Sequence, residues 1–379
     1  MKKGILLLQN KLIISLVLLT TFSAHGQIGG INAEFAGGGA RALAMGGAFI
    51  ALADDATAVE FNPAGLWNLR RPEVAFQAVY THDKRETPLL ELDPPEINTF
   101  FKDDTDSYII PSFASFVYPT QHFVLGLSEF TNVYYDRSYA LLYSDTEVDE
   151  KAENYTFGLT LATQLIDRLS IGGTVRYNKF KFSSRVDSPS GISRREFESE
   201  SPSVNLGVLW RPHRYFSFGA VYKSSQPLDG TYRIRDGAGN DISIDTELPS
   251  TFGLGLAFHP NQDWRILFDV DKIWWSDFYT DPEYKRKDVY RFHSGMEWYA
   301  GHLGDMGIFF RGGYMYEESN AIKYKGDNEY MREFTSHRDP IQHYTFGIGF
   351  ARPKYQIDLG MDLTNDNGND FIASMVMYF

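Results

Sequence analysis

The amino-acid sequence predicts an all-β fold: a transmembrane antiparallel β-barrel of about 14 strands, with a short, partly helical N-terminal hatch in its lumen. Three observations predict it. The chain begins with a segment typical of export signals, its later segments alternate apolar and polar residues between links that sort by length, and it ends on Phe379. We therefore divide the chain into a signal peptide at 1–26, a hatch or plug at 27–71 and a barrel at 72–379.

The composition fits this class and excludes others. The 379 residues include 33 Gly, 23 Tyr and 29 Phe, which suits tightly turning strands with aromatic rings at membrane interfaces. A formal net charge of −13 argues against a nucleic-acid partner, because such binding needs a basic surface. Without Cys, the chain has no disulfide, thiolate zinc site or catalytic thiol.

The first residues have the three parts of a signal peptide. Lys2, Lys3 and Lys11 give a positive start, and an apolar run from 12 to 19 follows. Small residues at Ala24 and Gly26 place cleavage before residue 27. The apolar run is too short for a membrane anchor, which needs about 20 residues. An exported protein without such an anchor is periplasmic, secreted or a barrel.

Period-two alternation recurs from Pro72 onward. In 355–363 the odd positions are Tyr, Ile, Leu, Met and Leu, whereas the even positions include Asp358 and Asp362. Soluble sandwiches also contain strands with one apolar and one polar face, so the links must discriminate. We predict strands that begin near residues 72, 108, 121, 152, 168, 197, 214, 248, 262, 286, 305, 341, 354 and 369.

The links between these strands alternate in length. We predict short turns at 119–120, 166–167, 212–213, 260–261, 301–304 and 353, and long polar links at 83–107, 134–151, 186–196, 225–247, 276–285 and 317–340. Short turns at one end and long loops at the other are typical of bacterial outer-membrane barrels. The pattern predicts the outer membrane of a Gram-negative-type bacterium, membrane lipid as a partner, and both termini in the periplasm. The link 365–369 is short, but Asn367-Gly368 suits a tight hairpin.

The final segment, 371–379, places Phe371 and Phe379 on one apolar face. A terminal Phe on such a strand resembles the signal read by the outer-membrane assembly machinery, which is therefore an expected partner. Glycine pairs at 172–173 and 312–313 could mark gaps in the wall, although Gly in strands more often marks bends.

Mixed charges fall on the polar faces of the predicted strands. They either form ion pairs that cross-link the wall and hold the hatch, or only solvate the lumen. We find no Ser/His/acid set and no metal-ligand set, so we predict no enzyme, cofactor or metal. The predicted lumen network consists of Arg176, Arg211, Arg265, Asp269, Asp271, Arg291, His293, Glu297, Arg311, Asp358 and Asp362.

The segment 27–71 does not alternate and is rich in Gly and Ala, which suits close packing inside a barrel. Asp54 can cap a short helix from Ala56 to Phe61. Asn62-Pro63 then ends the helix, since a residue before Pro avoids the helical conformation.

Within this segment a motif runs from Gly39 to Leu66. It contains Arg41, then Met45, Gly46 and Gly47, then Asp54 and Asp55, then Asn62, Pro63 and Gly65. The motif resembles the N-terminal signature of the FadL/TodX superfamily of outer-membrane transporters, including its PorV/PorQ-like relatives. The resemblance implies a 14-stranded barrel with a lumenal hatch, through which hydrophobic molecules captured outside pass the hatch and leave through the wall or into the periplasm.

Two functions follow from the resemblance. The first is a channel that takes up hydrophobic small molecules such as long-chain fatty acids; the alternative is a PorV-like barrel that binds or shuttles secreted proteins in type IX secretion, with secretion-system proteins as partners. A structural or enzymatic barrel is the third hypothesis. For the first function, an apolar lining would hold the ligand by burial. The hatch residues that either line such a site or only pack against the wall are Phe35, Phe49, Phe61, Leu66 and Trp67.

Overall fold

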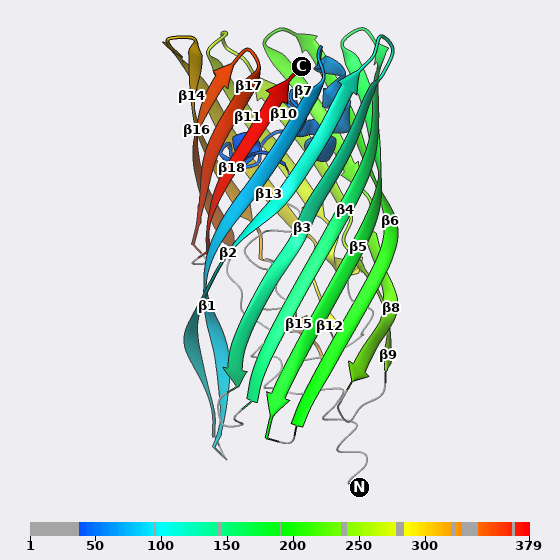
Figure 1. The fold of residues 1–379 in the computed structure, drawn as a ribbon, viewed down its shortest axis with the longest axis vertical. Helices are drawn as coiled ribbons and strands as arrows, with labels where there is room; N and C mark the ends of the chain where they lie inside the picture. Colours follow the sequence, from blue (N-terminus) through cyan, green and yellow to red (C-terminus); the bar gives the residue numbers. More distant parts are fainter. Residues whose placement is uncertain are drawn as a thin grey trace.

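The computed structural model describes residues 38–93, 96–141, 146–189, 191–235, 241–277, 284–319, 323–327, 340–365 and 368–379. Within these ranges, fourteen antiparallel strands form one closed barrel (Figure 1). The predicted signal peptide, hatch residues 27–37 with Phe35, and part of the turn at 365–369 lie outside the described residues.

Successive barrel strands pair in chain order, and pairing of the first strand with the last closes the ring, from Glu73 opposite Tyr378 to Asp83 opposite Gly368. The prediction of about 14 strands is confirmed. The strands are β1 Glu73–Asp93, β2 Glu96–Pro119, β3 Val124–Leu141, β4 Thr146–Ile166, β5 Leu169–Ser188, β6 Gly191–His213, β7 Phe216–Lys223, β10 Thr251–Phe258, β11 Trp264–Ile273, β13 Val289–Leu303, β14 Met306–Glu317, β16 Ile341–Arg352, β17 Tyr355–Thr364 and β18 Gly368–Tyr378.

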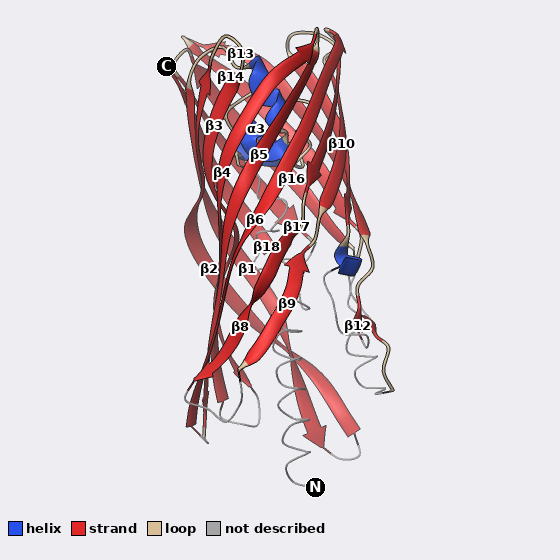
Figure 2. Ribbon diagram, turned by 90° about the vertical axis from the view of Figure 1, so that its right-hand side faces the viewer, coloured by secondary structure: helices blue, strands red, loops and turns tan. Residues whose placement is uncertain are grey.

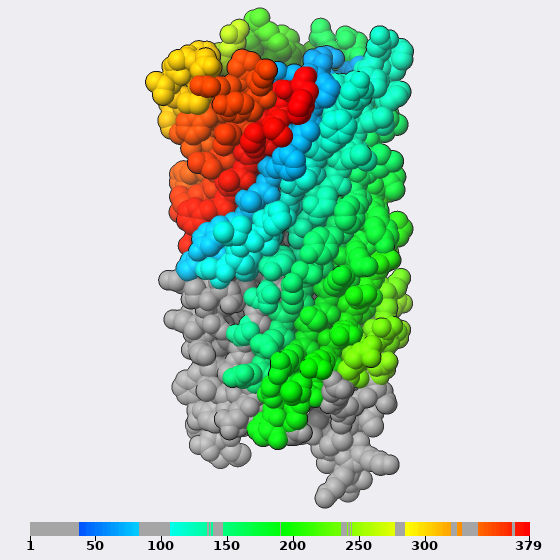
Figure 3. Space-filling model, in the orientation of Figure 1, coloured from blue at the N-terminus to red at the C-terminus, as the bar shows by residue number. Residues whose placement is uncertain are grey.

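The two faces of each strand differ as the alternation predicts. Leu159 on β4 and Phe268 on β11 point outward and are more than half exposed, whereas their neighbours Thr160 and Asp269 point inward and are buried. In Figure 3, β1 to β6 run obliquely across the outer face and cover the lumen. This is the arrangement of a membrane barrel, whose apolar outer face contacts the lipid acyl chains and whose inner face is polar.

The three longest links between barrel strands, 224–250, 274–288 and 318–340, lie at one end of the barrel, but several predicted long loops are wrong. Residues 83–107, 134–151 and 186–196 are mostly strand, since β1–β2, β3–β4 and β5–β6 extend far beyond the apolar band. On β5 the outward positions change from Val175 to Lys179 and Lys181, while Phe180 between them stays buried. Strand pairing continues where the outer face no longer needs to be apolar, so the apolar pattern ends before the strand does.

The short turns, at 120–123, 167–168, 214–215, 259–263, 304–305 and 353–354, gather at one end of the barrel, which we call the short-turn end (top in Figure 1). Phe379 lies there too, because its amide donates to the carbonyl oxygen of Pro72 at 3.0 Å. We call the opposite end the long-loop end.

Two small additions lie toward the long-loop end (Figure 2). A hairpin of β8 Gln226–Arg235 and β9 Ile242–Leu248 continues the wall, with β8 paired to β6. A second pair consists of β12 Tyr284–Lys285 and β15 Lys323–Tyr324, after the 3-10 turn η2 Trp275–Asp277. None of the helices in the described ranges is long and apolar enough to cross a bilayer.

The hatch fills the lumen near the short-turn end, where Figure 2 shows its helices inside the strands. It consists of α2 Ala40–Leu43, α3 Ala58–Phe61 and the 3-10 helix η1 Pro63–Asn68. The predicted helix is therefore shorter at its start, and Asp54 does not cap it. Instead, an Asp55 oxygen accepts hydrogen bonds from the backbone and the hydroxyl of Thr57, the residue before α3. The helix ends at Phe61, as predicted.

The outward alternation predicts a depth-dependent cost of charge on the wall. Leu159→Arg, in the apolar band of β4, should destabilise the barrel by about 2–4 kcal/mol. Glu198→Arg, on the charged outer face of β6, should change stability little. Denaturant unfolding in lipid vesicles measures both, and equal stabilities would contradict the assignment of the lipid-facing band.

Candidate functional site

The contact between hatch and wall centres on one fully buried carboxylate, that of Glu297 on β13. Arg41 of α2 donates from Nε to Oε2 at 2.8 Å and from Nη2 to Oε1 at 3.1 Å. Two wall arginines complete the group: Arg311 donates to Oε2 at 2.7 Å and Arg265 to Oε1 at 2.9 Å. Three guanidinium groups therefore share one carboxylate, two from the wall and one from the hatch.

Further carboxylates balance these arginines. Arg41 also pairs with two hatch residues, Asp54 at 2.6 Å and Asp55 at 3.0 Å, and Arg311 pairs with Asp358 of β17 at 2.8 Å. Buried charges are tolerated only when they are paired and hydrogen-bonded, and this network provides both. It joins the Arg and the Asp-Asp of the hatch motif to strands β11, β13, β14 and β17.

Other charges of the predicted lumen network contact the hatch backbone. Oδ2 of Asp269 accepts from the amides of Phe49 and Ile50 at 2.7 and 2.8 Å. Arg211 donates to the carbonyl oxygen of Leu52 at 3.1 Å. Each contact supplies a buried backbone group of the hatch with a partner that water would otherwise provide.

The remaining charges form pairs away from the Glu297 group. Asp271 lies 3.2 Å from both Arg291 and His293, and the other ring nitrogen of His293 hydrogen-bonds to the carbonyl oxygen of Gly46 at 2.7 Å. Arg176 pairs with the hatch residue Glu60 at 2.6 Å. Asp362 does not join the hatch contacts and pairs instead with His343 on the neighbouring strand at 2.7 Å.

Small hydroxyl residues of the wall complete the polar contacts. Thr345 accepts from the amide of Gly46 at 2.8 Å, and Ser217 donates to the carbonyl oxygen of Ala51 at 2.7 Å. Sequence analysis missed them, although they occupy inward positions of predicted strands. Similar contacts to the hatch backbone come from Ser115, Ser170, Thr174 and Ser374.

The Asn-Pro-Ala-Gly part of the motif holds two hatch segments and the wall together. Asn62 accepts from the amide of Ala64 at 3.1 Å and donates to the carbonyl oxygens of Ile50 and Val208 at 2.8 and 3.0 Å. Pro63 begins η1, where its missing N–H costs nothing. A Cβ on Gly65 would lie 2.1 Å from a hatch carbonyl oxygen, so the packing excludes any side chain there.

Earlier in the motif, Gly46 and Gly47 adopt positive φ values of 65° and 73°, which favour glycine. Together with the fully buried Met45, they form the turn that follows α2. This turn lies against the wall, because a Cβ on Gly313 would come 2.0 Å from the amide nitrogen of Gly46.

Inward-facing glycines of the wall are the functional residues that sequence reasoning most clearly missed. A Cβ on Gly207 would lie 2.1 Å from Asn62, one on Gly295 2.3 Å from the Met45 carbonyl oxygen, and one on Gly172 2.5 Å from Pro63. Gly172 and Gly313 thus admit the hatch backbone, and strand pairing is continuous at both, so neither marks a gap. Glycine recurring on the polar face of alternating strands was the available signal.

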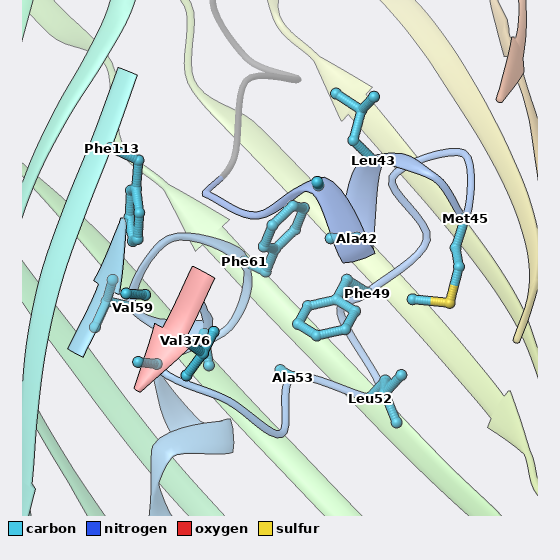
Figure 4. Close-up of a cluster of buried hydrophobic side chains, with 14 of the residues drawn as sticks. Ala42, Leu43, Met45, Phe49, Leu52, Ala53, Val59, Phe61, Phe113 and Val376 are labelled. Atoms are coloured by element: carbon cyan, nitrogen blue, oxygen red, sulfur yellow. The ribbon is translucent and has the colours of Figure 1, made fainter. Parts of the chain in front are cut away.

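Apolar side chains fill the space between these polar contacts. Phe49 and Phe61 meet edge to face, 5.2 Å apart, in a cluster that joins hatch and wall (Figure 4). Phe49 and Leu66 have no exposed surface, Phe61 has 9%, and Trp67 packs against the cluster while partly exposed. As the structure stands, these four candidates pack the hatch.

A second apolar cluster, which we call the loop-side cluster, lies beyond the hatch toward the long-loop end. On β5, Thr174 contacts the hatch, and Phe180 follows about 20 Å further along the strand. Tyr232 of β8 stacks on Phe182, with centroids 6.2 Å apart. The sequence did not predict this cluster: Leu228 and Tyr232 lie in the predicted long link 225–247, and most of the other members lie near the ends of predicted strands. Its members are Val133, Ala152, Phe180, Phe182, Phe197, Leu228, Tyr232, Leu248, Ile273, Trp275 and Val289.

A closed barrel with lipid-facing strands and a lumen filled by an N-terminal hatch defines the class of plugged outer-membrane channels. Residues 16–328 match the family described as outer membrane protein transport protein (OMPP1/FadL/TodX). The chain belongs to this family. Membership confirms a FadL/TodX-type outer-membrane channel for hydrophobic compounds, which is a transporter and not an enzyme, in the outer membrane of a Gram-negative bacterium.

Solved structures share the fold. A Pseudomonas aeruginosa FadL homologue is 15% identical with a TM-score of 0.68, over 91% of this chain and 98% of that one. The Ralstonia pickettii toluene transporter TbuX is 15% identical with a TM-score of 0.63, over 91% and 99%. The Pseudomonas putida toluene transporter TodX is 14% identical with a TM-score of 0.62, over 92% and 96%. Comparison with curated proteins finds no match.

The Glu297 group predicts a large penalty for removing its carboxylate. Glu297→Gln leaves three guanidinium groups around a neutral amide, so we expect a loss of about 3–5 kcal/mol. The exposed pair of Arg352 with Asp305 provides the control, because Arg352→Gln should cost no more than about 1 kcal/mol. Denaturant unfolding of the purified barrel compares them. A Glu297→Gln protein as stable as the control would show that the network does not hold the hatch.

The packing of the wall glycines predicts that alanine substitutions at the neighbouring residues Gly312 and Gly313 affect stability very differently. Gly313→Ala should destabilise the protein by about 1–3 kcal/mol through overpacking against the Gly46 amide. At Gly312, on the other face, a Cβ would lie 3.9 Å from the carbonyl oxygen of Thr345, an ordinary contact, so Gly312→Ala should be nearly neutral. Thermal unfolding distinguishes the two, and equal effects would mean that the hatch does not lie against β14.

Proposed function

We propose that the protein takes up a hydrophobic small molecule at the long-loop end, holds it in the lumen against the loop-side cluster, and releases it past the hatch at the short-turn end. The observation that carries the proposal is the second apolar cluster, which is separate from the core of the hatch. Apolar and aromatic side chains are typical of sites for apolar ligands, and Phe180, Phe182 and Tyr232 provide them. Its burial of a ligand would contribute about 25 cal/mol per Å² of apolar surface.

We further propose that the short-turn end faces the periplasm and that both termini lie there. Two features support this orientation. Every link at the short-turn end is short, whereas the three longest links, 224–250, 274–288 and 318–340, lie at the opposite end; in bacterial barrels the end with only short turns is the periplasmic one. Phe379, at the end of β18, lies at the same end as these turns.

Release past the hatch requires the hatch to move, because its core is closely packed. Its backbone contacts glycines and hydroxyl side chains on several strands, and Arg41 is anchored to the wall. Of the four candidates Phe49, Phe61, Leu66 and Trp67, Phe61 and Trp67 are the two that keep some exposure, so a shift of the hatch would begin where its packing is least complete. We propose that all four line the path that such a shift opens.

A reversible lock tests this movement. A Cβ on Gly360 of β17 would lie 3.6 Å from Cβ of Ala40, a separation that suits a disulfide. Because the chain has no Cys, Ala40→Cys/Gly360→Cys creates a single bridge between hatch and wall. We expect uptake of a labelled fatty acid into cells or vesicles to fall at least about tenfold on oxidation and to recover on reduction.

Each single-Cys variant is the control, since oxidation should not affect it. Uptake that continues in the fully bridged protein would exclude hatch movement as a requirement and favour release through the wall. A candidate place is the contact between β2 and β3, whose pairing ends at Phe113 and Phe130 although both strands continue toward the long-loop end. A stoichiometric protein partner without any bound lipid would instead support the role in protein secretion.

A further inference from the structure

The short-turn end contains a cavity of about 780 Å³. Two hatch residues, Leu52 and Asp54, form part of its wall. The turn after β4, the end of β6 with the turn that follows, and the link before β11 supply the rest. A molecule that has passed the hatch at this end would therefore meet the cavity next.

The cavity is lined by arginines. Arg168, Arg211, Arg214 and Arg265 all face it, whereas Asp54 is its one carboxylate residue. The whole chain carries a formal charge of −13, so a local excess of positive charge runs against its overall composition. Charged side chains at a concave surface concentrate the field there and attract ions of opposite sign.

The acidic groups nearby neutralise only part of this charge. Asp54 is already bound to Arg41 at 2.6 Å, and Arg265 is bound to Glu297 at 2.9 Å. Arg211 donates to the carbonyl oxygen of Leu52, and no carboxylate of the described residues lies within 4.0 Å of its guanidinium.

Two more arginines have weak or neutral partners. Arg214 donates to the hydroxyl of Tyr215 at 2.5 Å and stacks over its ring, with 4.6 Å to the centroid. Arg168 lies 3.4 Å from an exposed carboxylate, that of Asp167. These guanidinium groups retain donors for an incoming anion, and guanidinium binds a carboxylate through two parallel hydrogen bonds.

The positive charge does not depend on histidine. Burial and the neighbouring Arg265 lower the pKa of His259, which lies in the link before β11. The cavity is therefore cationic through arginine at every physiological pH. Leu52 and Phe216 add apolar surface to the same cavity, and Phe216 stacks on Phe258 with centroids 4.9 Å apart.

From this combination we infer that the cavity binds the carboxylate of an amphipathic acid as it leaves the hatch. The inference rests on the proposed function and narrows it: the substrate class is an aliphatic carboxylic acid and not a neutral hydrocarbon, which has no acceptor for the guanidinium donors. The hatch forms one wall of the cavity, which places the site on the transport path and not on the surrounding bilayer.

The test compares three ligands of equal chain length: decanoate, decanol and decyl phosphate. Each is titrated calorimetrically into the full-length protein in nanodiscs. The protein should bind decanoate about tenfold more tightly than decanol, as expected for hydrogen bonds between charged groups. In Arg211→Gln/Arg214→Gln the preference should fall to about twofold or less, with decanol affinity unchanged, which also shows that the variant is folded.

Arg352→Gln is the matched control, because this arginine lies at the same end but does not line the cavity. It should keep the full preference. As a second readout, the carboxyl ¹³C shift of labelled decanoate should titrate at lower pH when bound than when free, and the double variant should lose that difference.

The outcomes distinguish a failure of the carboxylate site from a failure of the proposed function. If decanol binds and decanoate binds no better, the carboxylate site is wrong and the channel proposal stands. If decyl phosphate binds far more tightly than decanoate, the cavity is a phosphate site, such as one for a lipid headgroup, and the inference is overturned. If none of the three binds, the proposed function itself fails.

Discussion

The carboxylate of Glu297 is the interaction on which the arrangement of this channel depends. It lies on a wall strand, yet one of its three guanidinium partners belongs to the hatch, so a buried charge of the wall anchors the plug. Removing the hatch would take away the two hydrogen bonds that Arg41 donates to Glu297, whereas removing the carboxylate would leave three guanidinium groups close together. The hatch thus supplies hydrogen bonds to a buried carboxylate of the wall as well as filling the lumen.

The close packing of hatch and wall also shows that the two are built to fit each other. The wall has glycine where the hatch backbone approaches, at Gly172, Gly207, Gly295 and Gly313, and serine or threonine where a hatch backbone group needs a partner. Asn62 plays the matching part in the hatch, because its side-chain amide donates to the carbonyl oxygen of Ile50 in the hatch and to that of Val208 in the wall. The hatch motif and the wall glycines therefore pack directly against each other, although they are separated by up to about three quarters of the chain.

Sequence alone predicted the barrel well because its constraint is local. Lipid on one face and polar groups on the other impose a period of two on every strand, and turns such as 353–354 interrupt it visibly. Beyond the bilayer this constraint disappears, which is why the segment that contains Leu228 and Tyr232 was predicted to be a long loop and not part of the wall. The inward set of charges could be named from the alternation, but its pairing could not: that Arg176 meets Glu60 while Asp362 meets His343 depends on strand order, tilt and the path of the hatch.

The great length of β4, β5 and β6 has a consequence for the cell surface. A strand of 20 residues, such as β5, is about 66 Å long, and even when tilted it rises well beyond an apolar band about 25 Å tall. The wall therefore projects beyond the membrane as a tube with charged residues on its outer face. In the orientation that we propose, its mouth would open within the saccharide coat, so that an oily molecule need not cross that hydrated layer unaided before it is captured.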